Sequence, residues 1–240
     1  MGLGFAAALV TGGCVASKPA PPRAMGLFTT LPILWPETGD LKGLLRNDTV
    51  PHWALAVLAA RGALRPLDML APHDGQTPLA GVGLLVMAQP RPLSPQENVA
   101  LDDWVRRGGR LLLFADPMLT QKSEFALGDR RRPQQIALLS PILSRWGLEL
   151  QFDNEQSAGE HAVDAFGGPI PVNLPGIVTV GKGSRQCEPQ PGVAGLYALC
   201  RIGKGRALVI ADAALFEAAP DAGQTDRAAA LERVLAEIDR

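Results

Sequence analysis

One stretch of the chain constrains the fold more than any other. Residues 81–117 read GVGLLVMAQPRPLSPQENVALDDWVRRGGRLLLFADP. Within it, Leu84–Ala88 and Leu111–Ala115 are continuous apolar runs of the kind found in parallel strands that are covered on both faces. Between the two runs lies a mixed polar and apolar segment with a helical pattern, which ends at Gly108-Gly109 directly before the second run. The stretch therefore predicts a strand, a helix and a strand in close succession.

The start of the intervening helix carries its own signal. Ser94, Pro95 and Glu97 occupy the positions of an N-cap, a first helical residue and the reciprocal partner of a capping box. Because a strand, a helix and a strand joined this tightly need a right-handed crossover, the two strands should be parallel neighbours. We therefore predict an α/β fold with a mainly parallel sheet and helices on both of its faces.

The flanking segments extend the same pattern. Met25–Trp35 is predicted to form a first strand, and His52–Gly62 a helix that ends at its glycine. Residues 63–72 then form a short strand, which completes a strand–helix–strand unit. The predicted buried face of the helix consists of Trp53, Ala56, Val57 and Ala60.

The second half of the chain is less regular. Residues 133–147 look helical, with Pro141 either kinking the helix or opening a second helix after a Ser140 cap. A strand is expected at 148–153, and the Gly- and Pro-rich region at about 154–195 reads as a β-rich insertion. A hairpin turning at Gly203–Gly205, with Ala207–Ala211 as its buried second strand, and an amphipathic helix at 226–238 close a single α/β domain over residues 25–240.

Residues 1–24 look like an export signal followed by a spacer. The first twelve residues are apolar or small and too few to span a bilayer, which takes about 20. Thr11–Cys14 resembles a bacterial lipobox, in which the cysteine is lipidated and becomes the N-terminus, and Ser17–Ala24 is a stiff, solvated spacer. The expectation is a periplasmic protein held at a membrane by a lipid on Cys14; the rival interpretation is a misassigned start, with translation beginning at Met25.

The cysteines and the charge of the chain bear on its compartment and on the kinds of molecule that it binds. Cys187 and Cys200 are either a disulfide, as an oxidising compartment would favour, or two separately packed thiols. The formal net charge of −1 gives no overall attraction for nucleic acid. The one basic cluster in the sequence is Arg130, Arg131 and Arg132, which is either a solvated loop or an anion-contacting site.

The carboxyl ends of the predicted strands are where an open parallel sheet binds ligands. Polar or aromatic side chains at these ends are Trp35, Glu37, His73, Asp74, Gln89, Arg91, Asp116 and Asp212. No serine or cysteine nucleophile occupies any of them, since Ser94 has a capping role. Asp116 and Asp212 follow equivalent apolar strands and either share a cation or water, or cap the next backbone segment.

Other sites are not indicated. Three scattered histidines do not form a metal triad, and the Gly203-Lys204-Gly205 sequence lacks the spacing of a phosphate-binding loop. A tight hairpin explains this sequence. The sequence predicts no metal and no cofactor.

The segments from Gly83 to Pro117 and from Arg201 to Phe216 resemble the GldG-type auxiliary components of uncharacterised ABC transport systems. The shared motifs are a strand, a helix opening, Gly-Gly, an apolar strand and Asp-Pro, and then Gly-Lys-Gly, an apolar strand and Asp. The resemblance implies a flavodoxin-like, class I glutamine amidotransferase-like domain that lacks the amidotransferase triad. It carries no catalytic residue onto this chain, and it implies a transporter subunit as partner.

Three functions follow as hypotheses. The first is a non-catalytic exported accessory or binding domain, tethered at a membrane and bound to an envelope protein or transporter subunit. The second is a carboxylate- or metal-dependent hydrolase or transferase that uses Asp116 and Asp212, with Arg130–Arg132 holding an anionic substrate. The third, which rests on fold class alone, is a cytoplasmic nucleotide or flavin binder.

Overall fold

The computed structural model describes residues 24–37, 51–181, 184, 186–189, 195–217 and 221–240. Cys14 and the lipobox-like motif lie outside these residues, so the lipidation hypothesis stays a prediction. No helix in the described part of the chain has both the length and the apolar character needed to cross a membrane.

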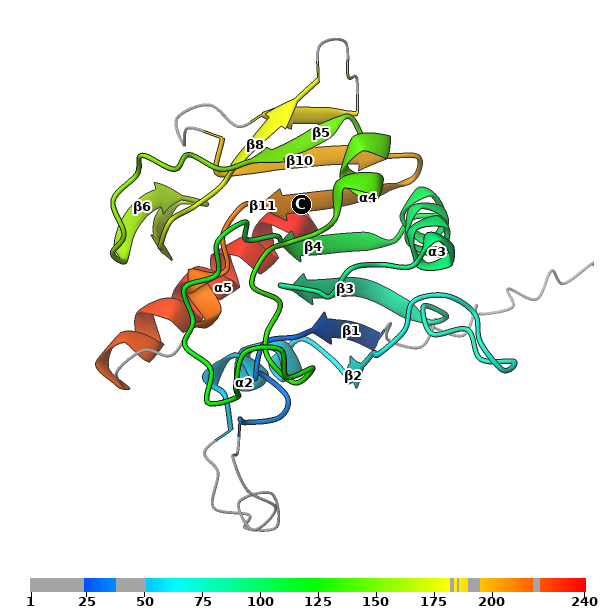
Figure 1. The fold of residues 1–240 in the computed structure, drawn as a ribbon. Coiled ribbons are helices and arrows are strands. Elements are labelled where there is room, and N and C mark those ends of the chain that lie inside the picture. The colour runs from blue at the N-terminus through cyan, green and yellow to red at the C-terminus, as the bar shows by residue number, and fades with distance from the viewer. Residues whose placement is uncertain (1–23, 38–50, 182–183, 185, 190–194, 218–220) are drawn as a thin grey trace, which may run out of the picture.

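The main sheet has seven strands in the order β2-β1-β3-β4-β11-β10-β9. The first five are parallel to one another, whereas β10 runs antiparallel to β11 and to β9 (Figure 1). Counted along the parallel part, this is the 2-1-3-4-5 order of flavodoxin-like folds, which confirms the predicted fold class. The strands are Ala24–Thr29 (β1), Leu64–Pro66 (β2), Val82–Ala88 (β3), Arg110–Phe114 (β4), Cys187–Pro189 (β9), Tyr197–Ile202 (β10) and Gly205–Ile210 (β11).

Helices cover both faces of this sheet. Trp53–Ala60 (α2) and Asp221–Asp239 (α5) pack on one face, and Pro95–Arg106 (α3) and Ser140–Arg145 (α4) on the other (Figure 1). Alternate residues of β4 supply both cores, because Leu112 and Phe114 face α5 while Leu111 and Leu113 face α3. Strands buried on both faces are why the sequence shows continuous apolar runs there.

The β-rich region lies beside the main sheet as two antiparallel pairs. Leu148–Gln151 (β5) pairs with Ile177–Val180 (β8), and His161–Ala165 (β6) pairs with Gly168–Val172 (β7). The β6–β7 hairpin packs against α5 and against a short 3₁₀ helix, η1 (Ala214–Phe216). The sequence predicts a β-rich insertion at about 154–195, and β6, β7 and β8 lie there in two small sheets that are separate from the main sheet.

The predicted strand–helix–strand unit at the centre is confirmed in detail. Ser94 caps α3 by accepting the Glu97 N–H at 3.2 Å, and the Glu97 carboxylate accepts the Ser94 N–H at 2.9 Å. β3 and β4 are parallel neighbours. The hairpin of β10 and β11 also forms as predicted.

Three local predictions are wrong. The buried face of α2 centres on Ala54 and Leu58, while Ala56 and Ala60 are exposed, because a short helix made almost entirely of apolar residues has little periodicity to read. Residues 133–139 are not helical. The helix that does form, α4, has Leu139 as its N-cap and no side-chain cap.

The two glycine motifs of the sequence meet in space. β4 and β11 are paired so that Arg110 lies beside Arg206 and Phe114 beside Ile210. The backbone of the β10–β11 turn therefore crosses the end of α3, where the Lys204 N–H donates to the Arg106 carbonyl at 2.9 Å. A Cβ atom on Gly205 would overlap the carbonyl oxygens of Val105 and Gly109, so only glycine fits there.

Candidate functional site at the carboxyl ends of the strands

The crevice between β1 and β3 is the topological switch point, where open α/β sheets usually bind ligands. Gln89 stands at its edge with a left-handed backbone (φ 43°), a rare conformation for a residue other than glycine. Its side chain is fully buried: the amide nitrogen donates to the carbonyls of Asp116 and Gln134, and the amide oxygen accepts the Asp116 N–H. Gln134 is itself held by Thr30, whose hydroxyl accepts the Gln134 N–H at 2.9 Å. The switch point is thus closed by the chain's own backbone.

Asp116 and Asp212 follow β4 and β11 and are both buried. Asp116 accepts the N–H groups of Met118 at 2.7 Å and Ala213 at 3.1 Å. Asp212 accepts those of Ala214 at 2.7 Å and Asn173 at 2.9 Å. Each carboxylate therefore turns the chain after its strand and fastens a second segment to it, which is the capping role that the sequence left open.

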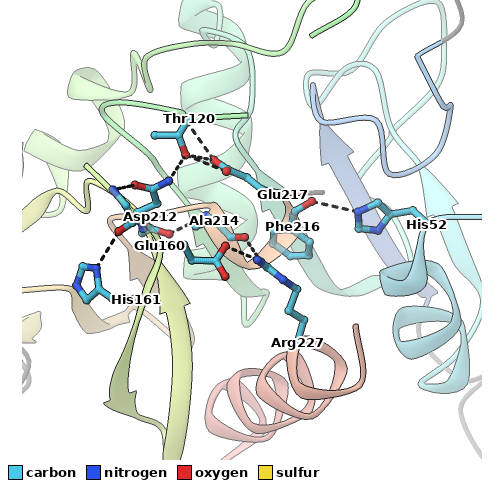
Figure 2. A network of polar contacts seen from close by, with 11 residues as sticks. His52, Thr120, Glu160, His161, Asp212, Ala214, Phe216, Glu217 and Arg227 are labelled. Carbon is cyan, nitrogen blue, oxygen red and sulfur yellow. Dashed lines mark hydrogen bonds and ion pairs between the residues drawn. The ribbon is translucent and has the colours of Figure 1, made fainter. Parts of the chain in front are cut away.

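Glu217 is a third buried acid in the same place. Its carboxylate accepts the Thr120 N–H and hydroxyl, and the Thr120 hydroxyl in turn accepts the Asn173 side-chain amide at 2.9 Å. Figure 2 shows this chain of contacts joining the loops that follow β4, β7 and β11. Three segments distant in sequence are fixed to one another here.

A buried arginine, Arg227, contacts the segment that follows Asp212. It lies on α5, is buried, and donates to the Ala214 carbonyl and to the Glu160 carboxylate (Figure 2). His52, the N-cap of α2, contacts the Phe216 carbonyl at 3.1 Å. η1 is consequently held from both sides by polar side chains.

Burial controls the charge of the two aspartates. Loss of water raises the pKa of Asp116 to about 7, against the opposing effect of its two backbone hydrogen bonds and with a further rise from Glu217. Burial also raises the pKa of Asp212 well above its usual range, and the negative charge of Asp116 adds to this rise. A carboxyl group with a pKa of about 7, such as that of Asp116, exchanges protons near neutral pH, but neither aspartate is open to a solute.

Two other residues proposed from the sequence fasten loops. Glu37 accepts the Ser123 hydroxyl and the Glu124 N–H. Arg91 forms a two-pronged ion pair with buried Glu97 and donates to the Asp68 carbonyl. Burial by itself would raise the pKa of Glu97, but the hydrogen bonds from Arg91 and from backbone N–H groups lower it to about 2.

The arginine run 130–132 is a surface loop. Arg131 pairs with Asp129 at 2.7 Å and stacks on the Phe125 ring, and Arg132 donates to the Phe125 carbonyl. Arg130 is exposed. Among the described residues, no hydrogen bond or ion pair joins this run to Asp116 or Asp212.

An apolar hollow lies elsewhere, on the surface of α3. It is an apolar groove of about 710 Å³ along the outer face of α3, bounded on its other side by the loop from Leu70 to Ala80. Val99 projects into it and is 62% exposed. The same stripe of the helix also contains Gln96, Ala100, Asp103 and Arg107. We name the hollow between this stripe and the loop from Leu70 to Ala80 the α3 groove.

The sequence did not indicate which residues join Asp116 and Asp212 in the polar network. Glu217, Thr120, Asn173 and Arg227 come from four separate segments, and only the fold brings them together. The α3 groove did have a signal: Val99 is an apolar residue on the polar side of an otherwise amphipathic helix. Within the described part of the chain, no cluster of three His, Cys, Asp or Glu side chains has the arrangement of a metal site.

Cys187 and Cys200 are joined as a disulfide between β9 and β10. Both residues are buried in the core that faces α3 and α4. The bond fastens the outermost strand of the main sheet to its neighbour.

These features define a flavodoxin-like α/β domain whose usual ligand-binding edge is filled by its own side chains and loops. The chain belongs to the family described as "ABC-type uncharacterized transport system", whose model matches residues 66–199. That match contains both walls of the α3 groove. No protein among curated sequences matches the chain.

Solved structures are similar to the chain at low sequence identity. An exo-β-1,4-mannosidase from Opitutaceae bacterium strain TAV5 is 13% identical with a TM-score of 0.53, over 89% of this chain and 36% of the mannosidase. A β-galactosidase from Rahnella sp. R3 is 15% identical with a TM-score of 0.45, over 90% of this chain and 31% of that enzyme. The chain thus spans about a third of these glycosidases. A glutamine amidotransferase from Thermotoga maritima is 9% identical with a TM-score of 0.49, over 91% and 99% of the two chains.

Proposed function

We propose that the protein is a non-catalytic accessory domain of an ABC transport system, exported and tethered at a membrane by a lipid on Cys14. The observation that carries the non-catalytic part is the state of Gln89, Asp116 and Asp212. All three stand where α/β enzymes place reactive groups, and all three are buried and bonded to backbone. Membership of a transport family supplies the class of partner.

The α3 groove is the surface where we expect this partner to bind. Its walls are largely apolar, and an apolar hollow with a few polar groups at its rim is a typical recognition site. The occupant we propose is an apolar segment of a membrane-spanning transporter subunit. The carboxylate of Asp103 at the rim would set its orientation.

Affinity purification of the full chain from membranes of its own host tests this proposal. We expect mass spectrometry to identify ATPase or membrane-spanning subunits of an ABC system in the eluate, and Val99→Glu to remove them without unfolding the domain. Leu127→Glu is the matched control, because Leu127 is an exposed apolar residue outside the groove. Equal recovery of the subunits with both variants would contradict the groove as the binding surface.

Export is tested separately at the N-terminus and at the disulfide. Mass spectrometry of the protein from its host should show an acylated Cys14 as the first residue; an intact Met1, or a start at Met25, would sink the tether. Thiol labelling after unfolding should find Cys187 and Cys200 unreactive until a reductant is added, as expected in an oxidising compartment.

A further inference from the structure

The amino ends of the parallel strands form a second functional surface, which we name the amino edge. It consists of residues 61–65, 80–83, 103–110, 201–206 and 237–240. Contacts join these segments directly: the Arg206 N–H donates to the Gly109 carbonyl, the Arg110 guanidinium to the Gly83 carbonyl, and Asp239 pairs with both Arg61 and Arg110. In Figure 1 the same edge lies opposite the arrowheads of β3, β4 and β11.

The amino edge is strongly basic. Its segments contain nine Arg or Lys residues and three Asp or Glu residues, although the whole chain has a net charge of −1. Two further acids, Asp102 and Glu232, pair with Arg106 and Arg61. The expectation that Arg130–Arg132 is the one basic patch is therefore wrong, because the fold assembles a larger patch from separate segments. The nine are Arg61, Arg65, Arg106, Arg107, Arg110, Arg201, Lys204, Arg206 and Arg240.

Three of these arginines stand in a row on one face of the sheet. Arg110 is the register partner of Arg206 in β11, and Arg206 is the register partner of Arg201 in β10. Like charges that face each other across strands repel. Within the described residues, Asp239 pairs with Arg110 but no acid pairs with Arg201 or Arg206. An anionic surface would relieve this repulsion.

The polypeptide also enters the domain at this edge. The Ala24 N–H at the start of β1 donates to the Gly81 carbonyl, next to residues that line the α3 groove. Cys14 precedes Ala24 by ten residues, a distance of at most about 35 Å when fully extended. A lipid on Cys14 would hold the amino edge, rather than the carboxyl edge, close to the membrane surface.

We propose that the amino edge docks on the anionic phospholipid headgroups of the membrane that holds the tether. This inference rests on the proposed tether and adds a defined orientation to it. Arg107 and Lys204, both exposed, and the row of arginines contact the phosphates. The carboxyl edge then faces away from the membrane, and the α3 groove, which runs between the two edges, opens sideways to a neighbouring transporter subunit.

Vesicle co-sedimentation of the full chain with Cys14→Ser, which cannot be acylated, tests the surface without the anchor. We expect binding to vesicles of phosphatidylcholine mixed with phosphatidylglycerol, no binding to phosphatidylcholine alone, and a loss of binding as salt rises to about 0.15 M, where screening acts within about 8 Å. The triple variant Arg107→Glu, Arg201→Glu, Lys204→Glu should bind about a hundredfold more weakly, since each of the three basic residues near such a surface contributes about fivefold.

The matched control changes net charge by the same amount away from the amino edge: Lys122→Glu, Arg130→Glu, Arg131→Glu. We expect it to bind the mixed vesicles as the parent does. Equal weakening in both triple variants, or equal binding to both lipids, would overturn the proposal. Tighter binding to a DNA duplex or to polyglutamate than to the mixed vesicles would also overturn it, in favour of another polyanion.

Should the glutamate triple variant lose its folded circular-dichroism spectrum, the corresponding alanine triple variant replaces it, with a smaller expected loss of binding.

Two results separate this inference from the proposed function. An acylated Cys14 with no dependence on phosphatidylglycerol refutes the docking surface and leaves the tether standing. An intact Met1 together with the expected vesicle binding refutes the tether and leaves the basic surface in need of another anionic partner.

Discussion

At the carboxyl ends of β4 and β11 the charged groups are acidic and buried, whereas at the amino ends of the same two strands they are mainly basic and reach solvent. Asp116 and Asp212 bond to backbone within the protein. At the other end, among the described residues, the side chains of Arg206 and Lys204 are not fastened to backbone in this way. The comparison teaches that one end of this sheet holds the fold together, and that the other end is available for contacts outside it.

One part of the amino edge does hold the fold together, namely the place where the β10–β11 turn crosses the end of α3. Gly205→Ala should lower the free energy of unfolding by about 3 kcal/mol or more, because its Cβ would collide with two carbonyl oxygens that cannot move independently. Chemical denaturation measures the loss. Gly181→Ala is the control, since its Cβ would meet one carbonyl oxygen at 3.4 Å; similar losses in both would show that the crossing is not tight.

Asp116→Ala should follow, at about 2–3 kcal/mol. The substitution leaves the N–H groups of Met118 and Ala213 without their acceptor in a buried setting. The same denaturation measurement applies, with Asp164→Ala on exposed β6 as a control that should change little. A small loss for Asp116→Ala would mean that water replaces the carboxylate, and that the carboxyl edge is more open than its burial indicates.

A pH dependence should distinguish the buried acids from the exposed bases. Because the pKa of Asp116 is raised from 3.8 to about 7 on folding, the folded state retains a proton that the unfolded state releases. Its stabilising contribution is full below about pH 4 and is lost as the pH rises through about 7. We expect the free energy of unfolding to fall by on the order of 2 kcal/mol between about pH 5 and about pH 8. Asp116→Asn should flatten this slope, and an unchanged slope would assign it to other groups.

The smallest expected effect is a gain. Arg201→Glu places an acid opposite Arg206 and should raise the free energy of unfolding by about 0.5 kcal/mol, as cross-strand pairs do. Thermal unfolding in low salt would detect it. Arg201→Gln should give part of the gain, and a loss with either variant would show that the arginine row is compensated within the protein.

Local signals predicted the centre of the fold well. Ser94, Glu97 and the apolar runs on either side of α3 specify their structure through neighbours in sequence, and the structure agrees with them. α2 shows the limit of this approach. Its residues are apolar all round, so only contacts with α5 and β1 decide that Ala54 and Leu58 face inward.

The candidate site was predictable only in part. The positions of Gln89, Asp116 and Asp212 at strand ends follow from the fold class, because carboxyl ends of parallel strands share an edge. Their burial does not, since it depends on loops that return from Gln134, Asn173 and Ala213. The basic amino edge was missed for the same reason: its nine basic residues lie in four separate segments, and no window of the sequence contains more than a few of them.

The pairing of β4 with β11 also governs when this sheet can be completed. Their register partners, such as Leu112 and Leu208, are almost a hundred residues apart, and β11 is needed to join β4 to β10. During synthesis the apolar edge of β4 therefore stays unpaired until residues 205–210 have been made, and pairings of such long range form slowly. We expect the nascent chain to depend on protection of this strand from aggregation, and fragments that end before β11 to be insoluble.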